Sequence, residues 1–198
     1  MFEKYIVPAL ITISSILTIV SVFPYLIDVL KRKTRPKVVT WFVWGLLTGI
    51  SCIASVVECQ WATAIMLGFS ALASFAIMAL GWKTGDKKFD RLDVFCLVCA
   101  IFGVVLWRLL DSPSAAVLIM IATDFIGGLP TTVHAWKKPN QETWQTFFMG
   151  LVGSVCTLLV IKTWQITSFA FPLFISANSL SVTLIIILRR LYLKKKTR

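Results

Sequence analysis

Charged residues are scarce in this chain. Only 15% of its 198 residues are Asp, Glu, Lys or Arg, whereas 58% are hydrophobic and the mean hydropathy is +0.84. Soluble domains carry about 25% charged residues, so the composition excludes a soluble enzyme domain. The length leaves room for one compact unit. The sequence therefore predicts a small all-α membrane protein whose function lies between its helices.

Residues that commonly perform chemistry are also few. His134 is the one histidine, and Asp124 is the one acid deep inside an apolar run. No phosphate-binding G-x-x-x-x-G-K-[ST] sequence occurs. Cys96 and Cys99 have C-x-x-C spacing, but no second cysteine pair or histidine lies nearby in the sequence, and we interpret all five cysteines as small buried hydrophobic residues. We expect no enzyme activity, no metal and no cofactor.

Apolar runs of roughly 20 residues, long enough to cross a bilayer, are marked off by charges. Seven are predicted, at about 5–30, 38–58, 61–82, 92–110, 114–136, 143–161 and 166–188. The first is too long for a signal peptide and lacks a small-residue cleavage site. We therefore expect it to be retained as a spanning helix.

The basic residues give the orientation. Of the 20 Lys and Arg, all except Lys4, Arg108 and Lys162 fall in one alternating set of loops and in the C-terminal tail. Cytoplasmic loops are rich in Lys and Arg, so we expect the N-terminus outside and the C-terminus in the cytoplasm of a plasma (inner) membrane. The net charge of +11 then indicates contact with anionic lipid and not with nucleic acid.

The chain contains an internal repeat. A shift of 106 residues lays 24–48 on 130–154 and matches Pro24 with Pro130, Lys31 with Lys137 and Thr40 with Thr146. The same shift places the first three runs on the last three and leaves the fourth unmatched. We expect a first three-helix repeat at 1–88, a linker helix at 89–111 and a second repeat at 112–198. The linker helix makes the two repeats parallel, as in transporters that bind substrate near the midplane between their halves.

Two segments carry a family resemblance, 23–34 (FPYLIDVLKRKT) and 129–138 (LPTTVHAWKK). Both resemble the proline-containing end of the first helix in a PQ-loop repeat, with Tyr25 and Thr131 where that motif has glutamine. The 3+1+3 plan resembles the SWEET sugar transporters and their relatives, which include amino-acid and PnuC-type vitamin transporters. The resemblance implies alternating access between two bundles, with Pro24 and Pro130 as gate hinges.

The gate residues predicted beside these prolines lie near the cytoplasmic ends of the two helices. The repeat places Asp28 opposite His134, so the two could form a cytoplasmic gate or proton relay. Solvation at the membrane interface is the alternative for this pair. A static kink is the alternative for the prolines.

A second set of residues is predicted to bind the solute at mid-membrane. Asp124 should face a cavity or a partner, because a charge in the bilayer centre costs at least about 2.5 kcal/mol. Asn178 suits a polyol, since its amide both donates and accepts, and the resemblance implies a binding asparagine in this helix. Matched stripes of small, hydroxylated and aromatic residues on the second and sixth helices would line a path or pack helices closely: Trp44, Thr48, Ser51, Ser154 and Thr157.

These features predict a uniporter or proton-coupled carrier for a small polar solute, with a sugar as the first expectation. A vitamin, nucleoside or amino acid is the alternative substrate. A seven-helix membrane receptor or sorting protein is the alternative class. The oligomeric state stays open, and a homo-oligomer is compatible with the sequence.

Overall fold

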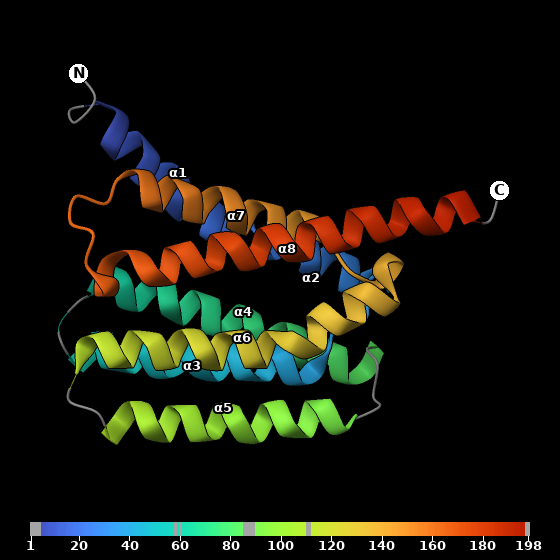
Figure 1. The fold of residues 1–198 in the computed structure, drawn as a ribbon, viewed down its shortest axis with the longest axis horizontal. Helices are drawn as coiled ribbons and strands as arrows, with labels where there is room; N and C mark the ends of the chain where they lie inside the picture. The colour runs from blue at the N-terminus through green and yellow to red at the C-terminus, as the bar shows by residue number, and fades with distance from the viewer. Residues whose placement is uncertain (1–4, 58, 60, 85–89, 110–111, 197–198) are drawn as a thin grey trace.

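The computed structural model describes residues 5–57, 59, 61–84, 90–109 and 112–196. All regular structure in these ranges is helical, and its long helices form seven runs (Figure 1). Lys4, Lys87, Lys88 and Arg198, which entered the charge argument, lie outside the described residues. The side chain of Arg108 lies outside them as well.

The seven runs lie close to the predicted ones. The first consists of α1 (Val7–Val20) and α2 (Val22–Leu30). It is followed by α3 (Val38–Val57), α4 (Trp61–Thr84), α5 (Arg91–Leu109), α6 (Pro113–Lys137), the 3₁₀ turn η2 (Pro139–Gln141), α7 (Trp144–Leu159) and α8 (Ile166–Lys196). The predicted end of the last run at 188 was wrong, because α8 continues through the basic tail.

Five of these runs are long and apolar enough to cross a bilayer, namely α1 with α2, then α3, α4, α6 and α8. Helix α7 is apolar but only 16 residues long. The chain is thus an all-α membrane protein. The five cysteines are free thiols, and Cys96 and Cys156 are buried as predicted, but Cys59 is exposed, so burial of all five was wrong.

Prolines shape two of the helices. Pro24 has no N–H to donate to the carbonyl four positions earlier, and the first run is interrupted at Ser21, three residues before it. Pro130 lies inside α6, and Figure 1 shows α6 bending in its C-terminal part. Both positions therefore distort their helices locally.

The helices form two bundles of three. In the first, α4 packs against α3 and against α1 and α2. In the second, α8 packs against α7 and α6. The bundles meet where α1 and α2 contact α7, and where α3 contacts α6. The 106-residue shift relates the first run to α6 and α3 to α7, so the two interfaces are equivalent under the repeat. Helix α5 packs outside them, on α6 and α3.

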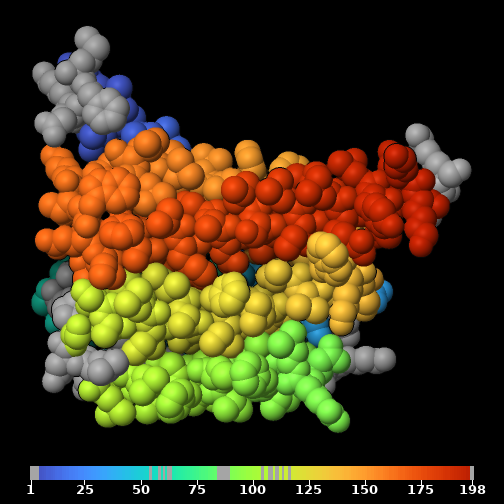
Figure 2. Space-filling model, viewed as in Figure 1, coloured from blue at the N-terminus to red at the C-terminus, as the bar shows by residue number. Residues whose placement is uncertain are grey.

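One end of the molecule carries most of the described basic residues, and we call it the basic end. There lie the 31–37 turn, the end of α6 with Lys137 and Lys138, and the C-terminal part of α8, which projects beyond the other helices (Figures 1 and 2). The first described residues of α1 lie at the opposite end, so the chain enters and leaves at opposite ends of the bundle (Figure 1).

Candidate functional site

The two bundles are joined at the basic end by their repeat-related turns. Helix α2 ends in a Schellman motif, in which Lys33 N donates to Asp28 O at 2.8 Å and Arg32 adopts a positive φ of 56°. This turn directs the chain toward the second bundle. There Arg35 N donates to Gln141 O at 3.0 Å, and these two positions are separated by the 106 residues of the repeat.

Glu142, directly after η2, is the centre of the contacts at this end. It is 1% exposed, although its side chain is ionisable. The Tyr25 hydroxyl donates to its Oε2 at 3.0 Å, and His134 Nδ1 lies 2.7 Å from its Oε1. Arg190 of α8 donates from Nη2 to the Glu142 carbonyl and from Nε to the Pro139 carbonyl at 2.9 Å. One carboxylate therefore connects α2 of the first bundle with α6 of the second, and α8 holds its backbone.

Burial also changes the acidity of this group. Removal from water raises the pKa of the Glu142 carboxyl above its ordinary value, because the charged form loses hydration. The neighbouring His134, Tyr25 and Arg190 oppose that rise by favouring the carboxylate. Two hydrogen-bonding groups and the charge of Arg190 thus compensate the burial of the acid.

A second polar contact between the bundles lies beside the first. Thr143 donates to Asp28 Oδ2 at 2.9 Å, and its hydroxyl lies 2.6 Å from that of Thr34. The sequence had led us to expect that Asp28 and His134 could bind each other. In the structure they do not. They bind the adjacent residues Thr143 and Glu142, because the turn after α6 lies between them.

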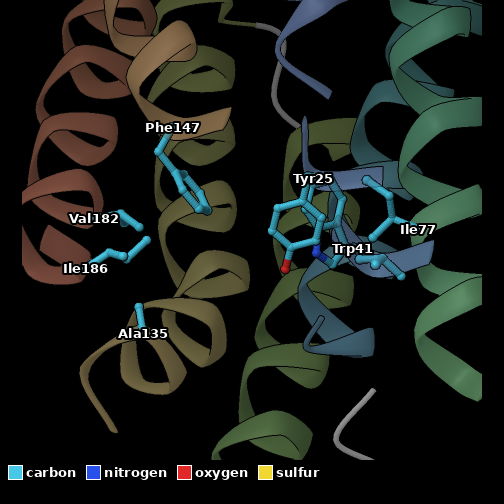
Figure 3. Packing of buried hydrophobic residues seen from close by; sticks show 8 residues of the cluster. Tyr25, Trp41, Ile77, Ala135, Phe147, Val182 and Ile186 are labelled. Carbon is cyan, nitrogen blue, oxygen red and sulfur yellow. The ribbon is translucent and has the colours of Figure 1, made fainter. Parts of the chain in front are cut away.

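An apolar cluster adjoins these polar contacts. Each bundle contributes four of its buried residues, and Figure 3 shows the two groups facing one another. Trp41 and Phe147 are related by the repeat, as are Val29 and Ala135. The remaining members are Tyr25, Ile77, Val182 and Ile186. Apolar packing and buried hydrogen bonds together close this end of the bundle interface.

Farther from the basic end, α3 and α6 bound a cavity with a volume of about 60 Å³. Leu47, Ile50 and Ser51 of α3 line it with Met120 and Thr123 of α6 and Gly103 of α5. Between the cavity and the basic end the two helices touch closely, since a Cβ on Gly127 would lie 2.6 Å from Val43 Cγ1. The cavity is therefore separated from the basic end by a tight helix contact.

The residues predicted to bind the solute divide into two groups. Ser51 lines the cavity, and Thr48 lies one turn earlier on α3, where it donates to Trp44 O at 2.7 Å. Asp124 and Asn178 are half-buried, and neither has a hydrogen bond or ion pair with another described residue. Their polar atoms are left available for a solute.

The predicted residues of α7 have a different role. Ser154 accepts a hydrogen bond from Ser176 of α8 at 2.8 Å. Thr157 shares one of 2.8 Å with Ser14 of α1, which also donates to the Gly153 carbonyl. Both side chains hold helices together, which is the packing role that the sequence had left open.

Several buried groups near the basic end lack a partner among the described residues, and Thr131 and Trp44 are two of them. Thr131, the repeat counterpart of Tyr25, is 1% exposed, and its hydroxyl makes no hydrogen bond there. The Nε1 of Trp44 is likewise without an acceptor in the described part of the chain. Such groups are costly when buried and mark positions that a ligand or water can satisfy.

Sequence reasoning missed Glu142, Arg190, Thr34 and Thr143. Glu142 stands in a basic turn, eight residues after the one histidine, and this acid among cations is the signal that could have identified it. The contacts of Arg190 had no such signal, since α8 brings it to η2 only in the folded chain.

The fold and these contacts define a class, a helical membrane protein in which two repeated three-helix bundles meet across a closed basic end and a cavity. Comparisons of the chain with family models, curated proteins and solved structures found no match.

Proposed function

We propose that this protein is a membrane carrier that moves a small polar solute by alternating access between its two bundles. The observation that carries the proposal is the asymmetry of the bundle interface along its length. The basic end is closed by the Glu142 contacts and the apolar cluster, whereas a cavity lies between α3 and α6 farther along. This is the arrangement expected of a carrier closed on one side.

The contacts at the basic end suit a closure that can be released. Apart from apolar packing, they comprise a small number of hydrogen bonds, each worth about 1 kcal/mol net. Carriers need states that differ by only a few kcal/mol, so that a solute can shift their populations. Opening would break the Tyr25 to Glu142 and Thr143 to Asp28 hydrogen bonds, while the bends at Pro24 and Pro130 absorb the motion.

The solute would bind at mid-membrane beside Ser51, Thr48 and Asp124, with Asn178 contributing from α8. A sugar is the first expectation, because hydroxyl, amide and carboxylate groups match a polyol. The unpartnered Nε1 of Trp44 favours a vitamin or nucleoside ring as the second candidate. Protons could drive transport through Asp124, or the solute gradient alone could suffice.

The protein would lie in a plasma (inner) membrane with its basic end in the cytoplasm. Reporter fusions at the C-terminus test this orientation. A cytoplasmic reporter should be active there, and a reporter that works only outside the cytoplasm should be silent. The reverse pattern would overturn the orientation.

Counterflow tests the transport proposal. Liposomes containing the purified protein are preloaded in turn with unlabelled glucose, sucrose, nicotinamide riboside and amino acids, and uptake of the matching labelled compound is followed. Exchange of one compound class would support a carrier and identify its substrate chemistry. If the folded protein exchanges none of a panel extended to further vitamins and nucleosides, the receptor or sorting class replaces the carrier.

The variants Asp124→Asn and Asp90→Asn form a matched pair for the coupling question. Both remove one carboxylate, but Asp90 is exposed at the basic end. If transport by the native protein depends on pH, Asp124→Asn should abolish that dependence and Asp90→Asn should retain it. Full pH-dependent transport by Asp124→Asn would remove Asp124 as the proton site.

A further inference from the structure

A cleft with a volume of about 170 Å³ opens at the basic end on the side of α5. It is bounded by the start of α3, the start of α5 and the last turns of α6. Its polar lining consists of Lys37, Asp90, Asp93, His134, Lys137 and Lys138. It lies where three long apolar helices begin or end, which is the depth of the lipid headgroups in a bilayer.

The charges of this cleft favour an anion. Lys37 Nζ lies 3.2 Å from Asp93 Oδ2 and 3.5 Å from Asp90 Oδ2, so one ammonium group is shared by the two aspartates and one negative charge is left over. Lys137 and Lys138, both exposed, add positive charge at the end of α6. Both lysines lie at the C-terminal end of α6, where the helix dipole favours cationic side chains.

His134 supplies a buried polar atom without a partner. The residue is 3% exposed and lines the cleft, and its Nε2 makes no hydrogen bond to any described residue. The other ring nitrogen, Nδ1, is 2.7 Å from Glu142 Oε1 and donates to it when that carboxyl is ionised. Nε2 is then an acceptor in the neutral ring and a donor in the cation.

A phosphate monoester matches both states of His134. As a monoanion it carries one P–O–H group, which can donate to a neutral Nε2. Its other oxygens can accept from a protonated Nε2 and from two lysine ammonium groups. Basic clefts between spanning helices at the membrane surface recognise such headgroups.

We propose that this cleft binds a phosphate monoester through Lys137, Lys138 and His134 Nε2. The ligand is either the headgroup of a lipid such as phosphatidic acid or a soluble phosphate. Because His134 also binds Glu142, occupation of the cleft acts directly on the contacts that close the basic end. The site is separate from the mid-membrane cavity, so it does not depend on the identity of a transported solute.

The single histidine permits a direct test. The full chain is labelled with ¹⁵N-histidine, purified through a tag without histidine, and placed in detergent micelles. Its imidazole nitrogen resonances are then recorded during titration with inorganic phosphate, dihexanoyl phosphatidic acid and dihexanoyl phosphatidylcholine. We expect the Nε2 resonance to move with phosphatidic acid and to be unaffected by phosphatidylcholine, a zwitterionic phosphodiester.

Inorganic phosphate distinguishes the sources. A shift with both phosphate and phosphatidic acid assigns the cleft to a soluble phosphate group, and a shift with phosphatidic acid alone assigns it to the lipid headgroup. No shift with either compound overturns the proposal, as does an equal shift with phosphatidylcholine. None of these outcomes depends on transport, so failure here and failure of the carrier proposal are distinguishable.

A matched pair of double variants tests the lysines. Lys137→Gln with Lys138→Gln removes two charges from the cleft, whereas Lys31→Gln with Lys33→Gln removes two exposed charges from the other turn at the same end. The first pair should weaken phosphatidic acid binding by about tenfold or more, since each lysine near an anionic group contributes about 1 kcal/mol. The second should bind nearly as the native protein does. Equal weakening in both would overturn the site.

Discussion

Replacement of Glu142 by alanine tests the centre of the basic end. The change removes the acceptor of two buried donors, the Tyr25 hydroxyl at 3.0 Å and the His134 ring at 2.7 Å. Tyr25 is fully buried and His134 is 3% exposed, so bulk solvent does not reach either donor in the folded protein. A buried donor left without a partner costs about 1–3 kcal/mol, and two such donors give about 4 kcal/mol.

Thermal unfolding in detergent measures this loss. A maleimide dye that fluoresces on reaction with thiols reports exposure of Cys96 and Cys156, which are buried in the folded protein. For a chain of this length about 1 kcal/mol shifts Tm by about 2–4 °C, so Glu142→Ala should lower Tm by about 10 °C. Glu142→Gln is the control, because its amide can accept from His134 and donate to Tyr25, and it should lose much less.

The decisive comparison is Tyr25→Phe in two backgrounds. In the native protein it breaks a hydrogen bond to Glu142 and should lower stability by about 1–2 kcal/mol. In Glu142→Ala it removes a hydroxyl that no longer has an acceptor, so it should raise Tm instead. If Tyr25→Phe lowers Tm equally in both backgrounds, the two residues are not coupled, and the reasoning about this end of the molecule is refuted.

Three further predictions concern stability, each measured as unfolding followed by tryptophan fluorescence. Burial raises the pKa of Glu142 above 4.5, so the protonated carboxyl stabilises the fold fully below pH 4.5, and this stabilisation is lost as the pH rises through the folded-state pKa. The native protein should therefore lose stability relative to Glu142→Gln over that pH window. A difference in stability that stays constant with pH would contradict this prediction. Gly103→Ala would place a Cβ 2.0 Å from a side-chain oxygen of α6 and should cost about 1–3 kcal/mol, whereas Gly49→Ala, with its nearest contact at 3.9 Å, should be neutral or stabilising. Lys37→Met should cost about 3–5 kcal/mol by leaving Asp93 buried and unpaired, and adding Asp93→Leu should recover most of that loss; additive losses would disprove the pairing.

The helices were predictable because their signal is local. Long apolar segments bounded by charges fixed the positions of seven runs to within a few residues, and only α8 was misjudged, since its basic tail continues the helix. A run of lysines ends an apolar segment without ending a helix, because lysine is a good helix former. Hydropathy therefore locates the membrane boundary and not the helix end.

The site was predictable only in part. Tyr25, His134 and Asp28 were identified from the repeat, but their partners were not, because repeat symmetry pairs equivalent positions and the turns pack asymmetrically. The second turn carries Glu142 where the first has Pro36, so the acid of one repeat binds the tyrosine of the other. Ser154 and Thr157 illustrate a further limit, since a hydroxyl on a helix face looks the same whether it lines a path or binds a neighbouring helix.

The sequence by itself determined that the chain is helical and that it belongs in a membrane, and it predicted that its two halves are related. Each of these depends on composition or on periodicity along the chain, and both are properties of neighbouring residues. Only the tertiary structure decided which polar groups meet, because burial of Glu142 requires donors from α2, α6 and α8 at one point. Residues more than a hundred positions apart in sequence come together there, and their selection depends on how the helices pack.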